Sequence, residues 1–117
     1  MIKVEHLTKS FVRNQKKFDA VHDVSLEIKK GEFAAIIGHS GSGKTTLFNM
    51  IAGLIHETSG KIYIDGNELT AMKDEEKNTF RNANMGYVLQ GQSLLSNFTI
   101  LDNILKHLHY FMGVFRV

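Results

Sequence analysis

Residues 38–46 combine small side chains with one lysine in the order GHSGSGKTT. Gly38, Gly43, Lys44 and Thr45 fit the spacing G-x-x-x-x-G-K-[ST], which is typical of loops that bind phosphate groups. Glycine accepts positive φ and lets the backbone approach a ligand closely. Successive N–H groups can then surround an anion. The alternative is an ordinary glycine-rich turn that binds nothing.

This spacing predicts a site for a nucleotide with Mg²⁺. Lys44 would reach the β- and γ-phosphates as a mobile point charge. Thr45 would offer its hydroxyl to Mg²⁺, which prefers hard oxygen ligands, and Thr46 is placed for the α-phosphate. The other expected nucleotide-binding positions of the loop are Gly38, His39, Ser40, Gly41, Ser42 and Gly43. At His39 a polar side chain that faces solvent is tolerated.

Such a loop needs a strand before it and a helix after it. Residues 33–37 are an apolar run, as expected of a strand that is buried on both faces of a parallel sheet. After the loop, Leu47, Ile51 and Leu54 recur at helical spacing, with Phe48 and Ala52 alongside. Gly53 is expected near the end of that helix.

The remaining elements follow from alternation and turn residues. Residues 2–7 and 21–28 alternate between apolar and polar side chains and predict two strands, joined by a polar connection over residues 11–18. With residues 33–37 they suggest a mixed sheet. Asp65 and Gly66 stand between two short alternating runs and predict a hairpin.

The C-terminal part predicts a helix, a strand and a second helix. Residues 72–81 are polar and compatible with a helix, and residues 85–90 predict a short apolar strand that ends on Gln90. Thr99 and Asp102 have the spacing of a capping box. They would open a helix with the apolar stripe Ile100, Ile104, Leu108 and Phe111.

Composition narrows the possible functions. A chain of 117 residues predicts one domain, and a net charge of +2 with scattered lysines gives no basic face, so no nucleic-acid partner is expected. The chain has no cysteine, which excludes disulfides, thiol nucleophiles and cysteine metal sites. No apolar run approaches the ~18 residues of a membrane span. The N-terminus lacks a secretory signal, so the expected compartment is the cytoplasm.

Several segments together resemble a known family. GHSGSGKTTL followed by IAGL and SGKIYIDG is similar to the nucleotide-binding subunit of ATP-binding-cassette (ABC) transporters. RNANMGYVLQGQSLLSNFTILDNI resembles the Q-loop segment of that family. The resemblance runs from about Ile2 to Ile104. The long connection before AVHDVSLEIKKGEF most resembles the subfamily of macrolide-export, lipoprotein-release and antimicrobial-peptide transporters.

The resemblance implies an α/β fold of the P-loop NTPase type. The expected parts are an N-terminal antiparallel β portion, the P-loop strand and helix, and the Q-loop strand. It also implies ATP and Mg²⁺ as cofactors. Phe11 falls where the family places an aromatic residue that stacks on adenine; the alternatives are that Phe11 is a core residue and that Phe18 takes this role. Gln90 would touch Mg²⁺ or the attacking water, or else be a polar residue at a strand end.

The resemblance also implies partners and a location. A transmembrane permease subunit and a second nucleotide-binding subunit would complete the transporter. The chain would then lie at the inner face of the cell membrane, as a peripheral cytoplasmic protein.

Other family motifs are missing from these 117 residues. The serine-glycine-glycine signature, the second acidic motif, the catalytic glutamate and the switch histidine are not found after Gln90. Asp65 ends a short apolar run like the second acidic motif, but a turn explains it better. His107 and His109 are two residues apart and do not face each other on a helix. We therefore expect residues 1–117 to be a single partial ABC nucleotide-binding domain that ends after the Q-loop, without the helical signature region.

The function expected from these motifs is that of a truncated ATP-binding subunit. It would bind Mg-ATP through the P-loop to energise transport, with Gln90 as its only candidate contact to the reacting water. Alone it would hydrolyse little ATP. Two alternatives are a non-catalytic nucleotide-binding or interaction module and a non-functional fragment. A small P-loop kinase would need a substrate lid and an acidic second motif, and neither is found.

Overall fold

Two long antiparallel strands form the framework of the N-terminal part of the chain. β1 spans Ile2–Arg13 and β2 spans Lys16–Ile28. They are joined at Asn14 and Gln15, whose φ angles of 50° and 62° are those of a tight two-residue hairpin turn. The expected polar connection over residues 11–18 is therefore wrong, because all but the two turn residues continue the strands.

The computed structural model describes residues 1–87 and 99–102. It divides into two units, Met1–Lys73 and Asp74–Val117.

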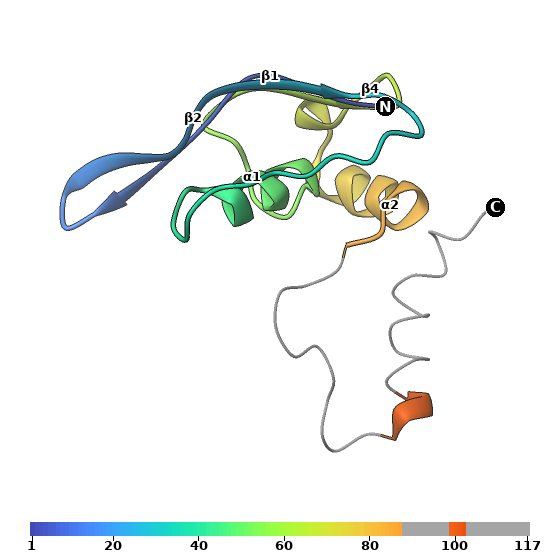
Figure 1. The fold of residues 1–117 in the computed structure, drawn as a ribbon. Coiled ribbons are helices and arrows are strands. Elements are labelled where there is room, and N and C mark those ends of the chain that lie inside the picture. Colours follow the sequence, from blue (N-terminus) through green and yellow to red (C-terminus); the bar gives the residue numbers. More distant parts are fainter. Residues whose placement is uncertain (88–98, 103–117) are drawn as a thin grey trace. The chain divides into compact units, whose positions relative to one another are not determined.

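The first unit contains a four-stranded sheet. β3 (Ser59–Ile64) pairs with β1, and β4 (Asn67–Glu68) pairs with β3, so the order is β2-β1-β3-β4. Figure 1 shows this sheet nearly edge-on. Every pair is antiparallel, and in the described residues the expected mixed sheet is not found. Asp65 and Gly66 join β3 to β4 with φ angles of 47° and 82°. This confirms the predicted hairpin.

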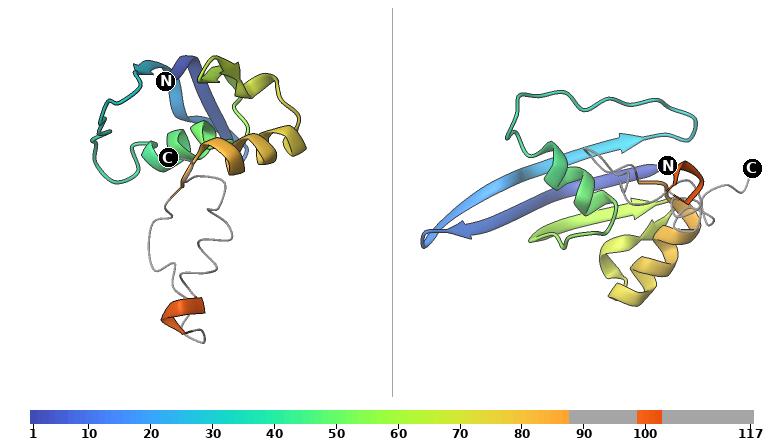
Figure 2. Two further views of the ribbon diagram at one scale, coloured as in Figure 1. Left: turned by 90° about the vertical axis from the view of Figure 1, so that its right-hand side faces the viewer. Right: turned by 90° about the horizontal axis from the view of Figure 1, so that it is seen from below.

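One helix, α1 (Lys44–Ile51), lies across a face of this sheet (Figure 2). It ends in a Schellman motif: the Leu54 N–H donates to the Asn49 carbonyl at 2.8 Å, and the Gly53 N–H donates to the Met50 carbonyl at 2.9 Å. Gly53 has φ 65°, which glycine adopts without a steric penalty. The predicted helix and its end at Gly53 are confirmed.

The core of the first unit lies between α1 and the sheet. From the predicted helical positions, Leu47, Ile51 and Ala52 are buried, whereas Leu54 and Phe48 are exposed. The prediction of the apolar face of this helix was therefore only partly correct. The full set of buried apolar residues is Val4, Leu7, Val21, Leu47, Met50, Ile51, Ala52, Ile62, Ile64 and Leu69, the last from the short 3-10 helix η1 (Leu69–Ala71).

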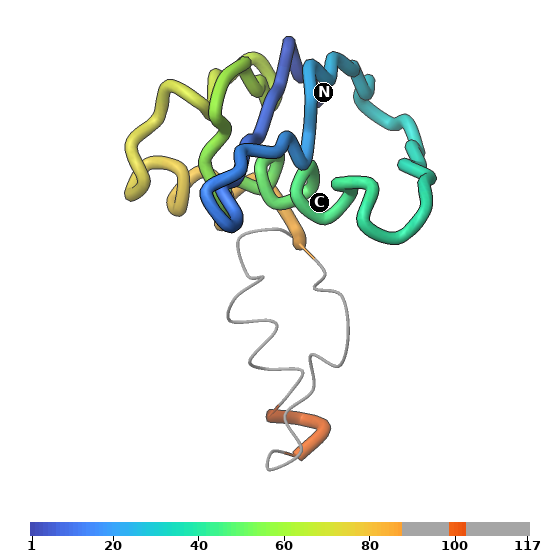
Figure 3. Tube along the Cα trace, turned by 90° about the vertical axis from the view of Figure 1, so that its left-hand side faces the viewer, coloured from blue at the N-terminus to red at the C-terminus, as the bar shows by residue number. Residues whose placement is uncertain are grey.

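The segment between β2 and α1 does not form the expected buried strand. After β2 the chain turns, with the Lys29 N–H donating to the Glu32 carboxylate at 2.7 Å. It then runs as a wide arc beside the sheet without regular structure (Figure 3). Phe33 and Ile37 are 98% and 91% exposed. A parallel strand is stabilised by hydrogen bonds to neighbouring strands, and none of the four described strands pairs with residues 33–37.

The second unit contains helix α2 (Asp74–Asn84), which confirms the helix expected near residues 72–81. Residues 85–87 are not in a strand, and the rest of the predicted strand, with Gln90, lies outside the described residues. The Thr99 hydroxyl donates to the Asp102 carboxylate at 2.6 Å, and the Asp102 N–H donates back to the Thr99 hydroxyl at 3.1 Å. The predicted capping box is confirmed, while Ile104, Leu108 and Phe111 lie outside the described residues.

Of the helices within residues 1–87 and 99–102, none has the length and apolar character needed to cross a bilayer.

Candidate functional site

The loop before α1 has the backbone pattern of an anion-binding nest. Gly41 and Gly43 have φ angles of 80° and 88°, and Ser42 between them has none of this left-handed character. Alternation of left- and right-handed residues turns successive N–H groups toward one side of the chain. The glycines at these two positions allow that alternation, because other residues rarely adopt positive φ.

The N-terminus of α1 adds three backbone donors to this loop. The first helical hydrogen bond runs from the Leu47 N–H to the Gly43 carbonyl at 2.9 Å. The N–H groups of Lys44, Thr45 and Thr46 therefore have no acceptor within the helix. No side chain caps this end, and the first turn holds no acidic residue. The site thus combines free donors with the positive end of a helix dipole, which favours an anion.

The Lys44 side chain folds back onto its own loop. Its ammonium group donates three hydrogen bonds, to the carbonyl oxygens of Gly38 and His39 at 2.6 and 2.7 Å and to the Ser42 hydroxyl at 3.0 Å. An ammonium has three donors, so the loop oxygens use all of them. The charge is held at the loop within reach of the α1 N-terminus.

Gly43 lies directly against the backbone of β2. A Cβ at this position would lie 2.0 Å from the Ala20 carbonyl oxygen and 3.5 Å from the Val21 side chain. Only glycine therefore allows β2 and the start of α1 to approach so closely. A Cβ at Gly38 would lie 2.7 Å from the Ser42 hydroxyl, a contact that rotation of the serine side chain relieves.

The other loop positions are exposed and contact mainly the loop backbone. The Ser42 N–H donates to the His39 carbonyl at 3.3 Å. The His39 Nδ1 lies 2.9 Å from the Ser40 carbonyl and donates to it in the Nδ1-protonated tautomer. His39 is thus placed as a polar residue on the outside of the loop.

Two phenyl rings lie near the tip of the β1–β2 hairpin. Phe11 and Phe18 are cross-strand partners, with ring centroids 5.9 Å apart and planes at 33°. The Lys9 ammonium lies 5.2 Å from the Phe11 centroid, within the range of a cation–π contact. Phe11 is 39% exposed, so the alternative that it is a core residue is wrong. Sequence reasoning missed Lys9, whose spacing of two from Phe11 on a strand places both on one face.

The strand register places these rings on the same face as the phosphate loop. Lys9 pairs with Val21, and Phe11 pairs with Phe18, with a bulge between these pairs. Directly opposed residues of antiparallel strands share a face, and the Val21 side chain lies 3.5 Å from the point that a Cβ of residue 43 would occupy. Val21 and Phe18 are three residues apart, or ~10 Å along β2. The arrangement can hold an aromatic base at one end and a polyphosphate at the other.

The carboxylate nearest to the rings in the sequence belongs to the opposite face. Asp19 pairs with Ser10; the Ser10 hydroxyl donates to Asp19 at 2.6 Å, and the His22 Nδ1 lies 2.9 Å from its other oxygen. The Ser10 hydrogen bond, followed by that of His22, lowers the pKa of Asp19 below its ordinary value. This negative charge is therefore bound on the side away from Phe11 and Phe18.

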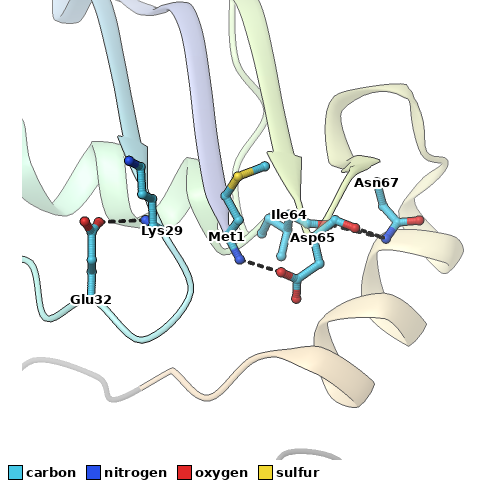
Figure 4. Close-up of polar contacts among 6 residues, drawn as sticks. All are labelled: Met1, Lys29, Glu32, Ile64, Asp65 and Asn67. Atoms are coloured by element: carbon cyan, nitrogen blue, oxygen red, sulfur yellow. Dashed lines mark hydrogen bonds and ion pairs between the residues drawn. The ribbon is translucent and has the colours of Figure 1, made fainter.

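Asp65 has a structural role in the hairpin turn (Figure 4). Its carboxylate accepts a hydrogen bond from the Met1 amino group, and its N–H donates to the Met1 carbonyl at 2.8 Å. The Asn67 side-chain amide donates to the carbonyls of Ile64 and Asp65, both at 3.3 Å. The amino group of Met1 lowers the pKa of Asp65. These contacts support the interpretation of Asp65 as a turn residue and not as a metal ligand.

Metal ligands are few in the described part of the chain. Within residues 1–87 and 99–102, no cluster of three His, Asp or Glu side chains could hold an ion. The Thr45 hydroxyl at the start of α1 is the described candidate, and Gln90 lies outside the described residues. The donors fit an Mg²⁺ ion that takes most of its oxygens from phosphate and water.

Comparison with known proteins agrees with this geometry. A family profile described as ABC transporter matches residues 21–114. The chain is 43% identical over 105 residues to a lipoprotein-releasing system ATP-binding protein of Bacteroides thetaiotaomicron, which covers 90% of this chain and 46% of the relative. It is 40% identical over 104 residues to a macrolide export ATP-binding/permease protein of Campylobacter fetus. That alignment covers 89% of this chain and 16% of the relative. The expected subfamilies are thus confirmed.

Solved structures show the same fold. A dimer of the ATP-binding cassette MJ0796 bound to ADP and Pi superposes with a TM-score of 0.86 at 35% identity, covering 95% of this chain and 48% of that chain. This confirms the expected P-loop NTPase fold class. The chain spans about half the length of the ATP-binding relatives it matches. The chain therefore belongs to the ABC transporter family, within its ATP-binding domain.

Proposed function

We propose that this chain binds Mg-ATP through residues 38–46 and acts within one nucleotide-binding domain that energises ABC transport. The observation that carries the proposal is the start of α1. Three backbone donors without helical acceptors, a left-handed glycine pair and a lysine ammonium converge there. Anions are stabilised at such helix N-termini.

Each residue of the loop has a role in this proposal. Lys44 exchanges its three hydrogen bonds with the loop oxygens for contacts with the β- and γ-phosphates. Thr45 supplies an oxygen to Mg²⁺, and Thr46 contacts the α-phosphate. Bound Mg²⁺ would neutralise phosphate charge. The remaining loop contacts come from Gly38, His39, Ser40, Gly41, Ser42 and Gly43.

Two residues outside the loop complete the proposed site. Phe11 stacks on the adenine ring, because its phenyl group is exposed on the face that carries the loop. Gln90 contacts Mg²⁺ or the attacking water, a role that rests on the family resemblance alone.

In this proposal the site binds ATP but hydrolyses it slowly. A positioned general base typically contributes ~10²–10⁴-fold to a rate, and the catalytic glutamate of the family is not among these 117 residues. In this proposal the chain lies on the cytoplasmic face of a membrane, beside a permease subunit and a second nucleotide-binding subunit. Turnover by the purified chain at the rate of complete family members would contradict this part of the proposal.

Thermal unfolding with and without Mg-ATP tests nucleotide binding. Ligand at 100 times its Kd stabilises the folded state by about 2.7 kcal/mol. Lys44→Ala should abolish this gain, whereas Lys16→Ala in the hairpin should keep it. The comparison uses the shift caused by the ligand, so a loss of intrinsic stability in the variant does not affect it. An equal ligand-induced shift in Lys44→Ala would refute the phosphate site.

A further inference from the structure

Two residues of the β1–β2 hairpin have a backbone conformation that strands rarely adopt. His6 and Asp23 have φ angles of 48° and 47°, in the left-handed region that is uncommon for residues other than glycine. His6 belongs to a two-residue bulge of β1 opposite Ser25, and Asp23 belongs to a two-residue bulge of β2 opposite Thr8. Figure 1 shows both strands bending before they reach the hairpin tip. Bulges bend a strand, and next to active sites they re-aim its side chains.

Hydrogen bonds hold the two bulges in a reciprocal arrangement. The His6 N–H donates to the Ser25 hydroxyl at 2.9 Å, and the Asp23 N–H donates to the Thr8 hydroxyl at 3.0 Å. In each bulge the side chain of the opposing residue thus accepts the N–H that has left the ladder. The His6 Nδ1 also lies 2.8 Å from the Asp23 carboxylate. Because the side chains of His6 and Asp23 are exposed, burial of these two groups does not explain the bulges.

The third strand of the sheet has a left-handed residue on the same line. Gly60 of β3 has a φ of 99° and stands opposite His6 and Leu7. A Cβ at this position would lie 2.5 Å from the His6 carbonyl oxygen and 2.6 Å from the Leu7 Cα. Glycine is therefore required where β3 passes the bulge of β1. We call the line of His6, Asp23 and Gly60 the crease.

The crease decides which face of the hairpin turns toward the core. Val4 and Leu7 are both buried although they are three residues apart, which a regular strand does not allow because its side chains alternate. Lys9 and its partner Val21 lie five residues beyond Val4 and its partner Leu26, yet Val21 is buried, as Val4 is. Without the bulges, this odd separation would turn Lys9 and Val21 to the outer face of the sheet.

We propose that His6 and Asp23 are positioning residues, which through the crease turn Phe11 toward the bound nucleotide. This inference rests on the proposed Mg-ATP binding by residues 38–46. Phe11 lies beyond the crease and on the face that carries the phosphate loop. A β1 strand without the bulge would point the phenyl ring to the opposite face. His6 and Asp23 act through the backbone and do not themselves contact the nucleotide.

Paired affinity measurements on the 117-residue chain test the crease. Isothermal titration with Mg²⁺ compares ATP, which in the proposed function uses Phe11 and the phosphate loop, with inorganic tripolyphosphate, which uses the loop alone. His6→Val is the disruptive change, because a β-branched residue resists positive φ. It should weaken ATP about tenfold, since one base stack is lost, and leave tripolyphosphate unchanged. His6→Gly keeps the left-handed backbone and should retain the wild-type ratio of the two affinities.

His22→Val is the matched control for this experiment. The His22 Nδ1 lies 2.9 Å from the Asp19 carboxylate, so an exposed imidazole–carboxylate contact is again lost, but the φ of His22 is not in the left-handed region. Its ratio of affinities should remain that of the wild type. Equal ratios in His6→Val and His22→Val would overturn the inference, even if the Tm of His6→Val is lower, because the role of the crease would then be structural only. A loss in His6→Gly as large as that in His6→Val would also overturn it.

A separate variant distinguishes this inference from the proposed function. Lys44→Ala should lose tripolyphosphate binding, and unchanged binding would overturn the proposed phosphate site whatever the crease variants do. Where His6→Val fails to fold, Ser25→Ala replaces it, because this change removes only the acceptor of the His6 N–H. Loss of that hydrogen bond should weaken ATP about threefold relative to tripolyphosphate. An unchanged ratio in Ser25→Ala would overturn the positioning role of the crease.

Discussion

Substitution of Gly43 by alanine should destabilise the chain through a single close contact. The new Cβ would lie 2.0 Å from the Ala20 carbonyl oxygen, far inside the contact distance of two heavy atoms. Because the obstacle is backbone, no side-chain rotation relieves it, and α1 and β2 must move apart. The residue must also hold a φ of 88°, which is unfavourable for any side chain with a Cβ.

The magnitude follows from these two effects. A left-handed conformation costs an alanine ~1–2 kcal/mol, and an overpacked contact costs a further ~1–3 kcal/mol. The sum of about 2–5 kcal/mol is a large part of the 5–15 kcal/mol that typically separates folded from unfolded domains. For a chain of this size it lowers the Tm by roughly 10–20 °C.

Gly41→Ala is the matched control for this prediction. Gly41 has a similar φ of 80°, but nothing lies within 4 Å of the point that a Cβ would occupy there. It should therefore lose only the conformational contribution of ~1–2 kcal/mol. Thermal unfolding followed by circular dichroism without nucleotide measures both variants. Equal losses in the two variants would refute the close approach of the loop to β2.

Three further predictions concern stability and metal binding. Leu7→Ala removes a fully buried side chain and should cost about 2–5 kcal/mol in denaturant unfolding. Thr45→Val should raise the Mg²⁺ concentration needed for ATP binding several-fold and leave metal-free tripolyphosphate binding unchanged, because only the proposed metal ligand is lost. Asp19→Asn should lower the Tm near pH 7, because Ser10 and His22 hold the pKa of Asp19 below 3.8. That stabilisation is present above the unfolded pKa and is lost as the pH falls through the folded one, so wild type and variant should converge below pH 3.8.

Each of these predictions has a contrary result. The Leu7 prediction fails if the variant unfolds no more easily than Val12→Ala, whose site is exposed. Thr45→Ser keeps the hydroxyl and should retain the wild-type Mg²⁺ dependence; a change as large as that of Thr45→Val would argue against a metal contact. A Tm difference at Asp19 that stays constant with pH would show that its carboxylate charge contributes nothing.

Local signals were sufficient for the turn at Asp65 and Gly66 and for the loop over residues 38–46. Asp65 and Gly66 predicted their hairpin because both positions need positive φ and aspartate and glycine tolerate it. The spacing from Gly38 to Thr45 predicted the loop, since the backbone geometry is encoded in those residues themselves. The turn at Asn14 was missed because glutamine, and not glycine, follows it.

Features that depend on distant partners were not predictable in the same way. Residues 33–37 have the composition of a buried strand, but strand formation depends on neighbours that composition does not supply. The shared face of Phe11, Phe18 and Gly43 depends on a bulge in the pairing of β1 with β2. A shift of one residue in that register would turn the side chains to the other face, and the alternation in the sequence does not specify it.

The exposed run at residues 33–37 also has a practical consequence. Phe33 and Ile37 stand almost fully in solvent in a segment without regular structure, and exposed apolar side chains of this kind favour association between chains. Concentrated samples of the chain should therefore form oligomers well below their melting temperature. Association between chains, and not unfolding, would then set the highest protein concentration at which nucleotide binding can be measured.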